Sequence, residues 1–156
     1  MKRSFLIVMM FVTALVGCKK DEKTQCDEVT IAAPASEVES LRTYIQANNI
    51  TAVEDARGFF YSVQAPGSGA KPTACSDVSV DYVGKLTNGS VFDSGNDVSF
   101  NLARLITGWQ EGIPLIGQGG SITLYLPPSL AYGSSASSSI PANSNLIFNI
   151  NLKTVY

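Results

Sequence analysis

The sequence predicts an α+β domain, a twisted antiparallel sheet of about five strands covered by one short helix, with an extra helix on its N-terminal side. From residue 58 onward, apolar and polar side chains alternate in short stretches separated by Gly, Pro and Asn, the pattern of half-buried antiparallel strands. Within this region only 107–115 suits a helix. Before it, one stretch has helical spacing.

The N-terminal helix is predicted over 37–48. Ser36 followed by Glu39 three residues later is a capping-box pattern, in which each side chain satisfies a backbone amide of the other residue. Three apolar residues then follow at helical spacing: Val38, Leu41 and Ile45. We expect so short an amphipathic helix to pack on its own domain; pairing with a second copy is the alternative.

Strands are expected over 59–64, 78–86, from 91, and over 122–126 and 146–153. Asn88-Gly89 lies between two of them and supplies the positive φ angles of a tight hairpin turn. The sheet should have a single apolar face, and the helix around Trp109 is available to cover it. Glu111 on that helix is expected to be solvated. The serine-rich run 134–139 reads as a loop.

Composition excludes several classes of function. The chain has 11 basic and 13 acidic residues and no histidine. Histidine-based acid/base catalysis, catalytic triads and His metal sites are therefore excluded, and no metal site is predicted. No phosphate loop or nucleotide motif is present, so no cofactor is expected. The mild net negative charge gives no electrostatic footprint for nucleic acid.

The N-terminus has the features of an export signal. Lys2 and Arg3 precede the apolar run 5–16, which is too short to cross a bilayer. It ends in Leu-Val-Gly before Cys18, which resembles a bacterial lipobox. The resemblance implies a signal peptide over 1–17, lipid (palmitate) on Cys18 and a membrane anchor. Removal of the signal peptide would leave 9 of the 11 basic residues against 13 acidic ones, a net charge of −4. An ordinary signal peptide is the alternative.

Downstream of Cys18, residues 18–57 would hold a polar tether and the short helix, and 58–156 the main domain. We expect the protein in the cell envelope, lipid-anchored to the outer membrane on the periplasmic face or the cell surface. The charged cluster 19–22 resembles tags that direct lipoproteins to the surface, but a merely solvated tether explains it equally well. With Cys18 acylated, export favours a disulfide between Cys26 and Cys75. Two independent buried thiols are the alternative.

Four blocks of the sequence occur in a recognisable order. They are Val-Phe-Asp-Ser at 91–94, Leu-Ile-Thr-Gly-Trp-Gln-Glu-Gly at 105–112, Leu-Ala-Tyr-Gly at 130–133 and Ile-Pro-Ala-Asn-Ser at 140–144 before Leu-Ile-Phe at 146–148. Together they resemble the FKBP family of peptidyl-prolyl cis/trans isomerases, over roughly 58–156. The resemblance implies an FKBP-like sheet half-wrapped around one helix, and an isomerase that uses no cofactor.

The resemblance also implies an apolar slot for proline with a few polar groups at its rim. Trp109 would form the floor, Asp93 would face Tyr82, and Tyr132 and the Ile106 amide would donate hydrogen bonds to substrate carbonyls. Any one of the apolar residues taken alone could be plain core. The implied catalytic residues are Tyr82, Phe92, Asp93, Ile106, Trp109 and Tyr132; the implied substrate-binding residues are Phe100, Leu105, Ile140 and Phe148.

The favoured function is isomerisation of Xaa-Pro bonds in exported proteins that fold slowly, by a monomer. A non-catalytic chaperone or peptide-binding module on the same fold is the alternative, and a structural lipoprotein is a third. Macrolide inhibitors of the family are further candidate ligands. Two departures affect the mouth of the slot: Ala142 replaces the family's usual second proline, and 134–139 is short in side-chain bulk. They leave substrate preference and macrolide affinity open.

Overall fold

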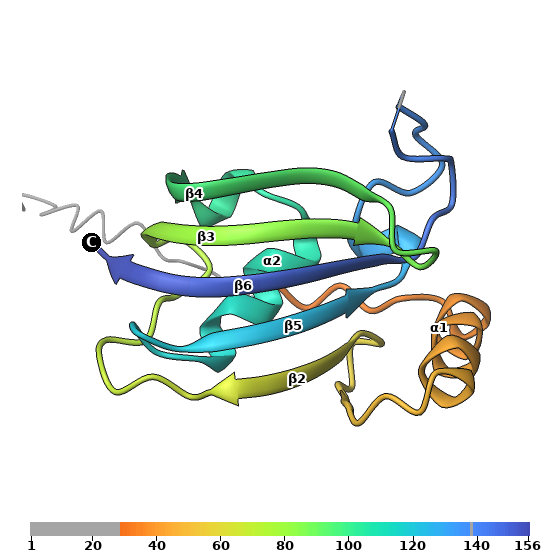
Figure 1. Cartoon of the computed structure of the whole chain (residues 1–156), viewed down its shortest axis with the longest axis horizontal. Coiled ribbons are helices and arrows are strands. Elements are labelled where there is room, and N and C mark those ends of the chain that lie inside the picture. Colours follow the sequence, from red (N-terminus) through yellow and green to blue (C-terminus); the bar gives the residue numbers. More distant parts are fainter. Residues whose placement is uncertain (1–28, 138) are drawn as a thin grey trace, which may run out of the picture.

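The computed structural model describes residues 29–137 and 139–156. Its centre is a six-stranded antiparallel sheet with the order β1-β2-β5-β6-β3-β4, and α2 lies behind the sheet in the view of Figure 1. The strands are β1 Val53–Glu54, β2 Phe60–Ala65, β3 Asp77–Leu86, β4 Val91–Asn101, β5 Ser121–Leu126 and β6 Leu146–Val155. The helices are α1 Ala35–Ala47 and α2 Thr107–Gly112, with 3-10 turns η1 Leu102–Arg104, η2 Ile113–Leu115 and η3 Pro128–Leu130.

The predicted architecture is confirmed. Every strand expected from alternation is present, and the stretch expected to be helical is α2 followed directly by η2. The additional strand, β1, has only two residues, which is too short for a period of two to be visible in a sequence. α1 is present on the N-terminal side, as predicted.

The hairpin between β3 and β4 forms where Asn88-Gly89 predicted it, with one difference. Only Gly89 takes a positive φ, at 88°. Asn88 instead accepts a hydrogen bond at its Oδ1 from the Ser90 N–H at 2.9 Å, and the Leu86 N–H reaches the Ser90 carbonyl. The turn is thus wider than a two-residue hairpin, and it needs a single left-handed residue.

The start of α1 differs from the predicted capping box. The N-cap residue is Pro34, it makes no side-chain cap, and Ser36 lies inside the helix. Proline suits a helix start because its fixed φ and missing N–H cost nothing there. The carboxylate of Glu37 turns away from the helix end and accepts the Ser129 N–H at 2.8 Å. Glu39, the acidic member of the predicted box, accepts a hydrogen bond from Arg42 instead, so the capping box does not form.

The prediction of a single apolar face is wrong, because the sheet carries an apolar patch on each side. The inner side faces α2 and holds the main core. On the outer side, Phe60 and Tyr125 are buried together with three residues of α1, and Ile147 packs against them. These α1 residues are the predicted Val38, Leu41 and Ile45. Figure 1 shows α1 at one end of the sheet, near β2 and β5.

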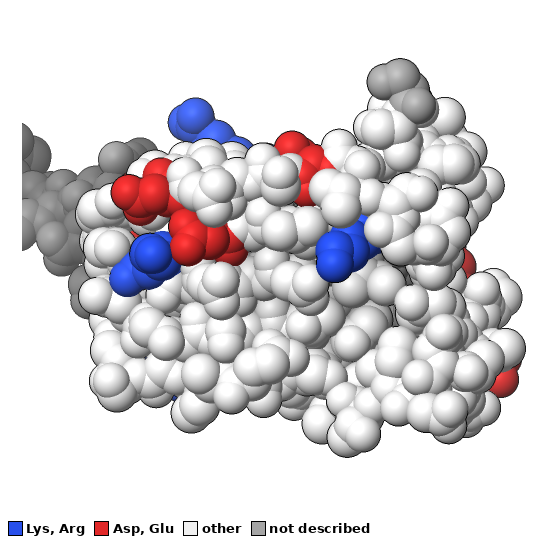
Figure 2. Space-filling view, in the orientation of Figure 1, with Lys and Arg blue, Asp and Glu red and all other residues white. Residues whose placement is uncertain are grey.

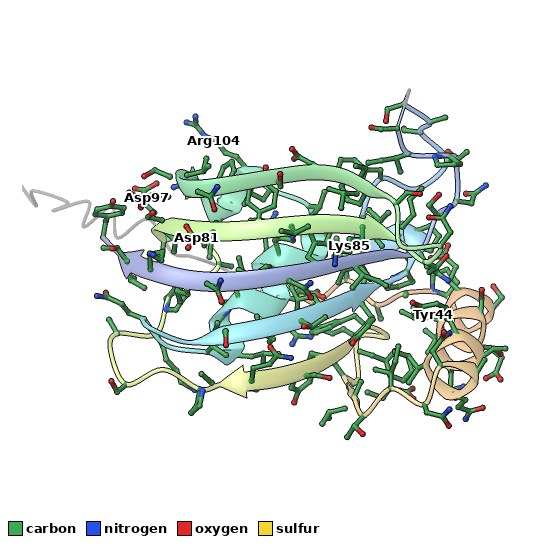
Figure 3. All side chains as sticks on the ribbon, viewed as in Figure 1. Tyr44, Asp81, Lys85, Asp97 and Arg104 are labelled. Carbon is green, nitrogen blue, oxygen red and sulfur yellow. The ribbon has the colours of Figure 1, made fainter. Side chains whose placement is uncertain are left out.

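The rest of the outer face is polar and carries few charges. Figure 2 shows this face, with its charged residues gathered mainly over one part of the sheet. Figure 3 labels Asp81 and Lys85 on β3 and Asp97 on β4 among them. Across the uncharged part, the Gln64 amide donates to the Thr123 hydroxyl at 3.1 Å, and that hydroxyl donates to the Asn149 Oδ1 at 3.0 Å. This ladder joins β2, β5 and β6.

Candidate active site

Four aromatic rings meet on the inner side of the sheet. The Trp109 ring on α2 lies 5.2 Å from Tyr82 on β3, 5.3 Å from Phe148 on β6 and 5.8 Å from Phe100 on β4, measured between ring centroids. All three pairs are edge-to-face, with interplanar angles of 82° to 89°. This geometry suits the quadrupoles of aromatic rings. The three neighbouring rings therefore stand nearly perpendicular to the plane of the indole.

The rings enclose a hollow of about 220 Å³. Trp109 is only 4% exposed and lies at its base, whereas Tyr132 is 45% exposed and lies near its mouth. The indole Nε1 has no hydrogen-bond partner among the described residues. The residues that line the hollow are Tyr82, Asp93, Phe100, Arg104, Leu105, Ile106, Trp109, Tyr132 and Phe148.

Most of the implied site residues therefore come together in one place. Phe92 and Ile140 do not line this hollow but an adjoining one of about 290 Å³, which shares Asp93 and Tyr132 with it. Phe92 still contacts the ring cluster, since its ring lies 5.5 Å from Phe148. Phe100 is fully part of the cluster, because its ring contacts both Tyr82 and Trp109.

Three glycines near the hollow make contacts that leave no room for a side chain. A Cβ at Gly108 would lie 2.5 Å from the Leu126 methyls, and one at Gly112 would lie 2.6 Å from those of Leu124. Glycine at both positions lets α2 lie directly on β5. On β3, a Cβ at Gly84 would lie 2.6 Å from the Phe92 ring. The absence of a side chain at Gly84 therefore leaves space for the Phe92 ring.

The two phenols that line the hollow remain protonated hydrogen-bond donors. The Tyr82 hydroxyl donates to the Asp93 Oδ2 at 2.8 Å, and the Ser94 N–H donates to the other carboxylate oxygen at 2.9 Å. Burial, together with this bond and the negative charge of Asp93, raises the pKa of Tyr82 to about 12. Burial, followed by the charge of Asp93, also raises the pKa of Tyr132. Both phenols keep their protons at neutral pH.

Two donors remain for a ligand. The Tyr82 proton is used by Asp93, but the Tyr132 hydroxyl has no acceptor among the described residues. The backbone N–H of Ile106 likewise makes no hydrogen bond within the described chain. Both groups belong to residues that line the hollow. The arrangement can hold the carbonyl groups of an extended chain whose apolar side chain fills the space above the indole.

Arg104 lines the hollow but was not among the predicted residues. It ends η1, directly before Leu105, and Figure 3 shows its side chain reaching outward from that turn. Among the described residues it makes no ion pair. No sequence signal distinguishes such a residue from an ordinary solvated arginine. Its proximity to Leu105-Ile106 was the only available indication.

The expectation that Glu111 is solvated is wrong. It is 3% exposed, and both of its carboxyl oxygens lack hydrogen-bond partners in the described chain. Arg57 lies 3.9 Å away but binds Asp55 at 2.7 Å and 3.0 Å. Burial raises the pKa of Glu111 to about 7, with the nearby Arg57 charge opposing the rise. A helix of six residues packed on a sheet leaves little of its surface in water.

The predicted modifications involve residues outside the described part. Cys75 is disulfide-bonded, but Cys26, its predicted partner, is not among the described residues, so this pairing stays a prediction. Cys18 and the predicted signal peptide also lie outside the described residues. In the part of the chain that the structure describes, no helix has the length and apolarity needed to span a membrane.

Comparison with known proteins places this geometry in a family. The model of the FKBP-type peptidyl-prolyl cis-trans isomerase family matches residues 68–153. The chain is 42% identical over 102 residues to the FKBP-type peptidyl-prolyl cis-trans isomerase FkpA of Aeromonas hydrophila, covering 63% of this chain and 38% of that protein. The corresponding FkpA of Escherichia coli K12 is 41% identical, with the same coverage. The chain thus spans about two fifths of the curated relatives it matches.

Solved structures agree with the fold. A peptidyl-prolyl cis-trans isomerase from Pseudomonas syringae superposes with a TM-score of 0.68 at 31% identity, over 79% of this chain and 96% of that one. The structure of FkpA from Escherichia coli superposes with a TM-score of 0.69 at 35% identity, over 78% of this chain and 60% of that one. Both superpositions extend well beyond the four sequence blocks.

Proposed function

Because the chain belongs to the FKBP-type peptidyl-prolyl cis-trans isomerase family, we propose that it catalyses rotation about Xaa-Pro bonds in exported proteins. The single observation that supports this most is the hollow over Trp109, lined by aromatic rings and supplied with two unused donors. Its partners would be unfolded or folding chains that expose proline. No covalent bond is broken, so no nucleophile, metal or cofactor is required.

The pocket supplies what the reaction needs. Amide resonance sets a barrier of about 18–20 kcal/mol to rotation, and water stabilises the polar resonance form through the carbonyl oxygen. A site that removes this water, and holds the flanking backbone, favours the twisted amide over the planar one. Upright rings around Trp109 exclude water from a bound proline ring. Hydrogen bonds from Tyr132 and Ile106 would hold the carbonyls on either side.

The Asp93 carboxylate orients rather than reacts. Both of its oxygens already accept hydrogen bonds, from Tyr82 and from the Ser94 amide. Its role would be to fix the Tyr82 ring against Trp109 and so keep the wall in place. The isomerase needs no proton transfer from it.

A protease-coupled assay on a short Xaa-Pro peptide tests the proposal. Trp109→Leu should lower kcat/KM by about 10-fold or more, and Tyr132→Phe by about 3-fold to 10-fold, because each loses contacts made to the rotating bond. Gln64→Met on the outer face is the matched control and should match wild type. Tight peptide binding without faster isomerisation would instead identify a non-catalytic chaperone, and folded site variants with full activity would place the site elsewhere.

We further propose that Cys18 carries lipid and anchors the protein to the outer membrane, on its periplasmic face or at the cell surface. The supporting features are the basic start, the short apolar run and the Leu-Val-Gly-Cys sequence. Palmitate labelling of wild type that disappears in Cys18→Ser is the expected result. Equal labelling of the two proteins would contradict it.

A Cys26–Cys75 disulfide would tie the tether to the domain. Cys75 is disulfide-bonded, and an acylated Cys18 would leave Cys26 as the remaining cysteine. Alkylation without reduction, followed by peptide mapping, should show a linked pair and no free thiol.

The same purified protein should elute as a monomer. It is also suited to test macrolide binding at the hollow over Trp109, which we propose as a secondary ligand site.

A further inference from the structure

Gln110 makes an unusual hydrogen bond beneath the rim of the hollow. Its side-chain Nε2 donates to the backbone carbonyl of Leu105 at 2.7 Å, across the start of α2. This lies at the short end of the range for N–H···O bonds. Gln110 is the only donor to that carbonyl among the described residues. The helix has no side-chain N-cap, and the neighbouring Leu105 N–H and Ile106 carbonyl are bonded within the backbone.

The carbonyl that Gln110 binds is covalently coupled to a donor of the proposed site. The Leu105 C=O and the Ile106 N–H belong to one planar peptide group. The Ile106 N–H has no acceptor in the described chain, and both residues line the hollow. A hydrogen bond at the oxygen of an amide polarises the group and strengthens its N–H as a donor.

Within the described chain, Gln110 makes the only hydrogen bond to the peptide group between Leu105 and Ile106. Leu105 has φ −99° and ψ 175°, and Ile106 has φ −59° and ψ 147°, so the peptide between them lies in extended chain. It belongs to no helix or strand that would fix its plane. Gln110 returns from the first turn of α2 and binds the carbonyl side, which leaves the N–H on the opposite side for a ligand.

We propose that Gln110 is a positioning residue that orients and polarises the Leu105–Ile106 peptide, so that the Ile106 N–H meets the substrate carbonyl. This inference rests on the proposed isomerase function and deepens it. Gln110 would act through the backbone and would not touch the substrate. The proposal gives a role to a residue that lies in one of the four sequence blocks but was not among the implied site residues.

Gln110→Met tests the role because it keeps the length of the side chain and removes the donor. We expect kcat/KM on an Xaa-Pro peptide to fall by about 3-fold to 10-fold. In the free protein, the ¹⁵N resonance of the Ile106 amide should move upfield, because its peptide group is less polarised. Gln64→Met is the control: it loses a similar side-chain bond, to Thr123 at 3.1 Å, and should change neither quantity.

Gln110→Glu adds a pH signature that a merely structural role would lack. A protonated glutamic acid can donate to the Leu105 carbonyl, whereas a carboxylate can only repel it. Isomerisation followed by NMR exchange spectroscopy, which needs no protease, should therefore recover towards wild type as the pH falls. A flat pH dependence relative to wild type, or a Gln110→Met protein with unchanged kcat/KM, would overturn the inference.

The two proposals fail in distinguishable ways. If wild type does not accelerate isomerisation, the proposed function is wrong. The Ile106 amide resonance then decides the coupling alone, because it is measured without substrate. An upfield shift in Gln110→Met but not in Gln64→Met would support the coupling, and an unchanged resonance would refute it.

Discussion

A helix packs on each side of the sheet, and the two contacts differ in what they leave open. α1 places branched aliphatic side chains against Phe60 and Tyr125, and Leu41 at the centre is fully buried. α2 places glycines against Leu124 and Leu126, and its one large apolar side chain, Trp109, lies beside a hollow of about 220 Å³. Side chains fill the contact between α1 and the sheet, whereas the contact between α2 and the sheet leaves a hollow beside the helix.

This difference separates stability from function. Branched side chains that interlock stabilise the fold in proportion to the apolar surface they bury. Glycine contacts bring backbones together but fill no volume, so the rings around α2 must hold their own positions. We therefore expect substitutions beneath α1 to alter the free energy of unfolding and leave catalysis intact. Substitutions along α2 should affect both.

The largest expected effect breaks the outer contact. Leu41→Ala should lower the free energy of unfolding by about 2–5 kcal/mol, through lost burial and the cavity left behind. The kcat/KM of the folded protein should not change. Urea unfolding and the peptide assay measure the two quantities. Val53→Ala, at a side chain that is 56% exposed, should change neither. A loss of kcat/KM in folded Leu41→Ala would show that the two sides are coupled.

A second prediction uses the buried carboxyl on the inner helix, for which the exposed Glu39 on α1 is the counterpart. The pKa of Glu111 is raised from 4.5 to about 7. Between these values the unfolded chain releases its proton first, so wild-type stability should fall as the pH rises through this window and stay low above it. The rise to about 7 already includes the opposing charge of Arg57, and it corresponds to a penalty of at most about 3 kcal/mol.

Glu111→Gln removes that penalty. At pH 8 the variant should be more stable than wild type by about 1–3 kcal/mol, and at pH 5 the difference should largely vanish. Urea unfolding at both pH values measures this. Glu39→Gln, whose side chain is 66% exposed, should change stability little at either pH. Parallel pH profiles for wild type and Glu111→Gln would contradict the prediction.

The smallest expected effect concerns the glycine contact itself. In Gly112→Ala, the new methyl meets Leu124 at 2.6 Å, and the strain outweighs the gain in helix propensity by about 1 kcal/mol. Because α2 must move away from β5 to make room for the methyl group, the hollow over Trp109 should be disturbed. We therefore expect kcat/KM to fall although the loss of stability is small. Ala47→Leu at the exposed end of α1 adds a larger group and should have no effect on activity. An active, fully stable Gly112→Ala would mean that α2 tolerates a gap.

The sheet could be predicted because strand alternation is a local property. Ile122, Leu124 and Leu126 face inward as their period of two requires, and Gly89 marks its turn. The outer patch could not be predicted the same way. Tyr125 and Ile147 have the register of solvent-facing residues, and only the distant α1 converts that face into core. Likewise Ser36 and Glu39 were assigned to a local capping box, but the helix begins after Pro34 without a side-chain cap, and Glu39 binds Arg42 instead.

The candidate site was predicted through the resemblance of four sequence blocks to a family, and the structure brings most of the implied residues around one hollow. Two polar residues of α2 were not anticipated in the same way. Glu111 and Gln110 have roles that depend on which side of a six-residue helix meets which neighbour. Less than two turns is too short for a hydrophobic period to establish a face. A buried carboxyl and a backbone-directed amide therefore looked like ordinary polar residues.

The position of β6 constrains how the molecule can be assembled. It pairs with β5 on one side and with β3 on the other, yet it follows every other strand along the chain. While the polypeptide is still being synthesised from its N-terminal end, the β2–β5 pair and the β3–β4 pair have no strand to join them. The complete sheet therefore cannot form before β6 is available, and we expect the pairings of β6 to be completed last.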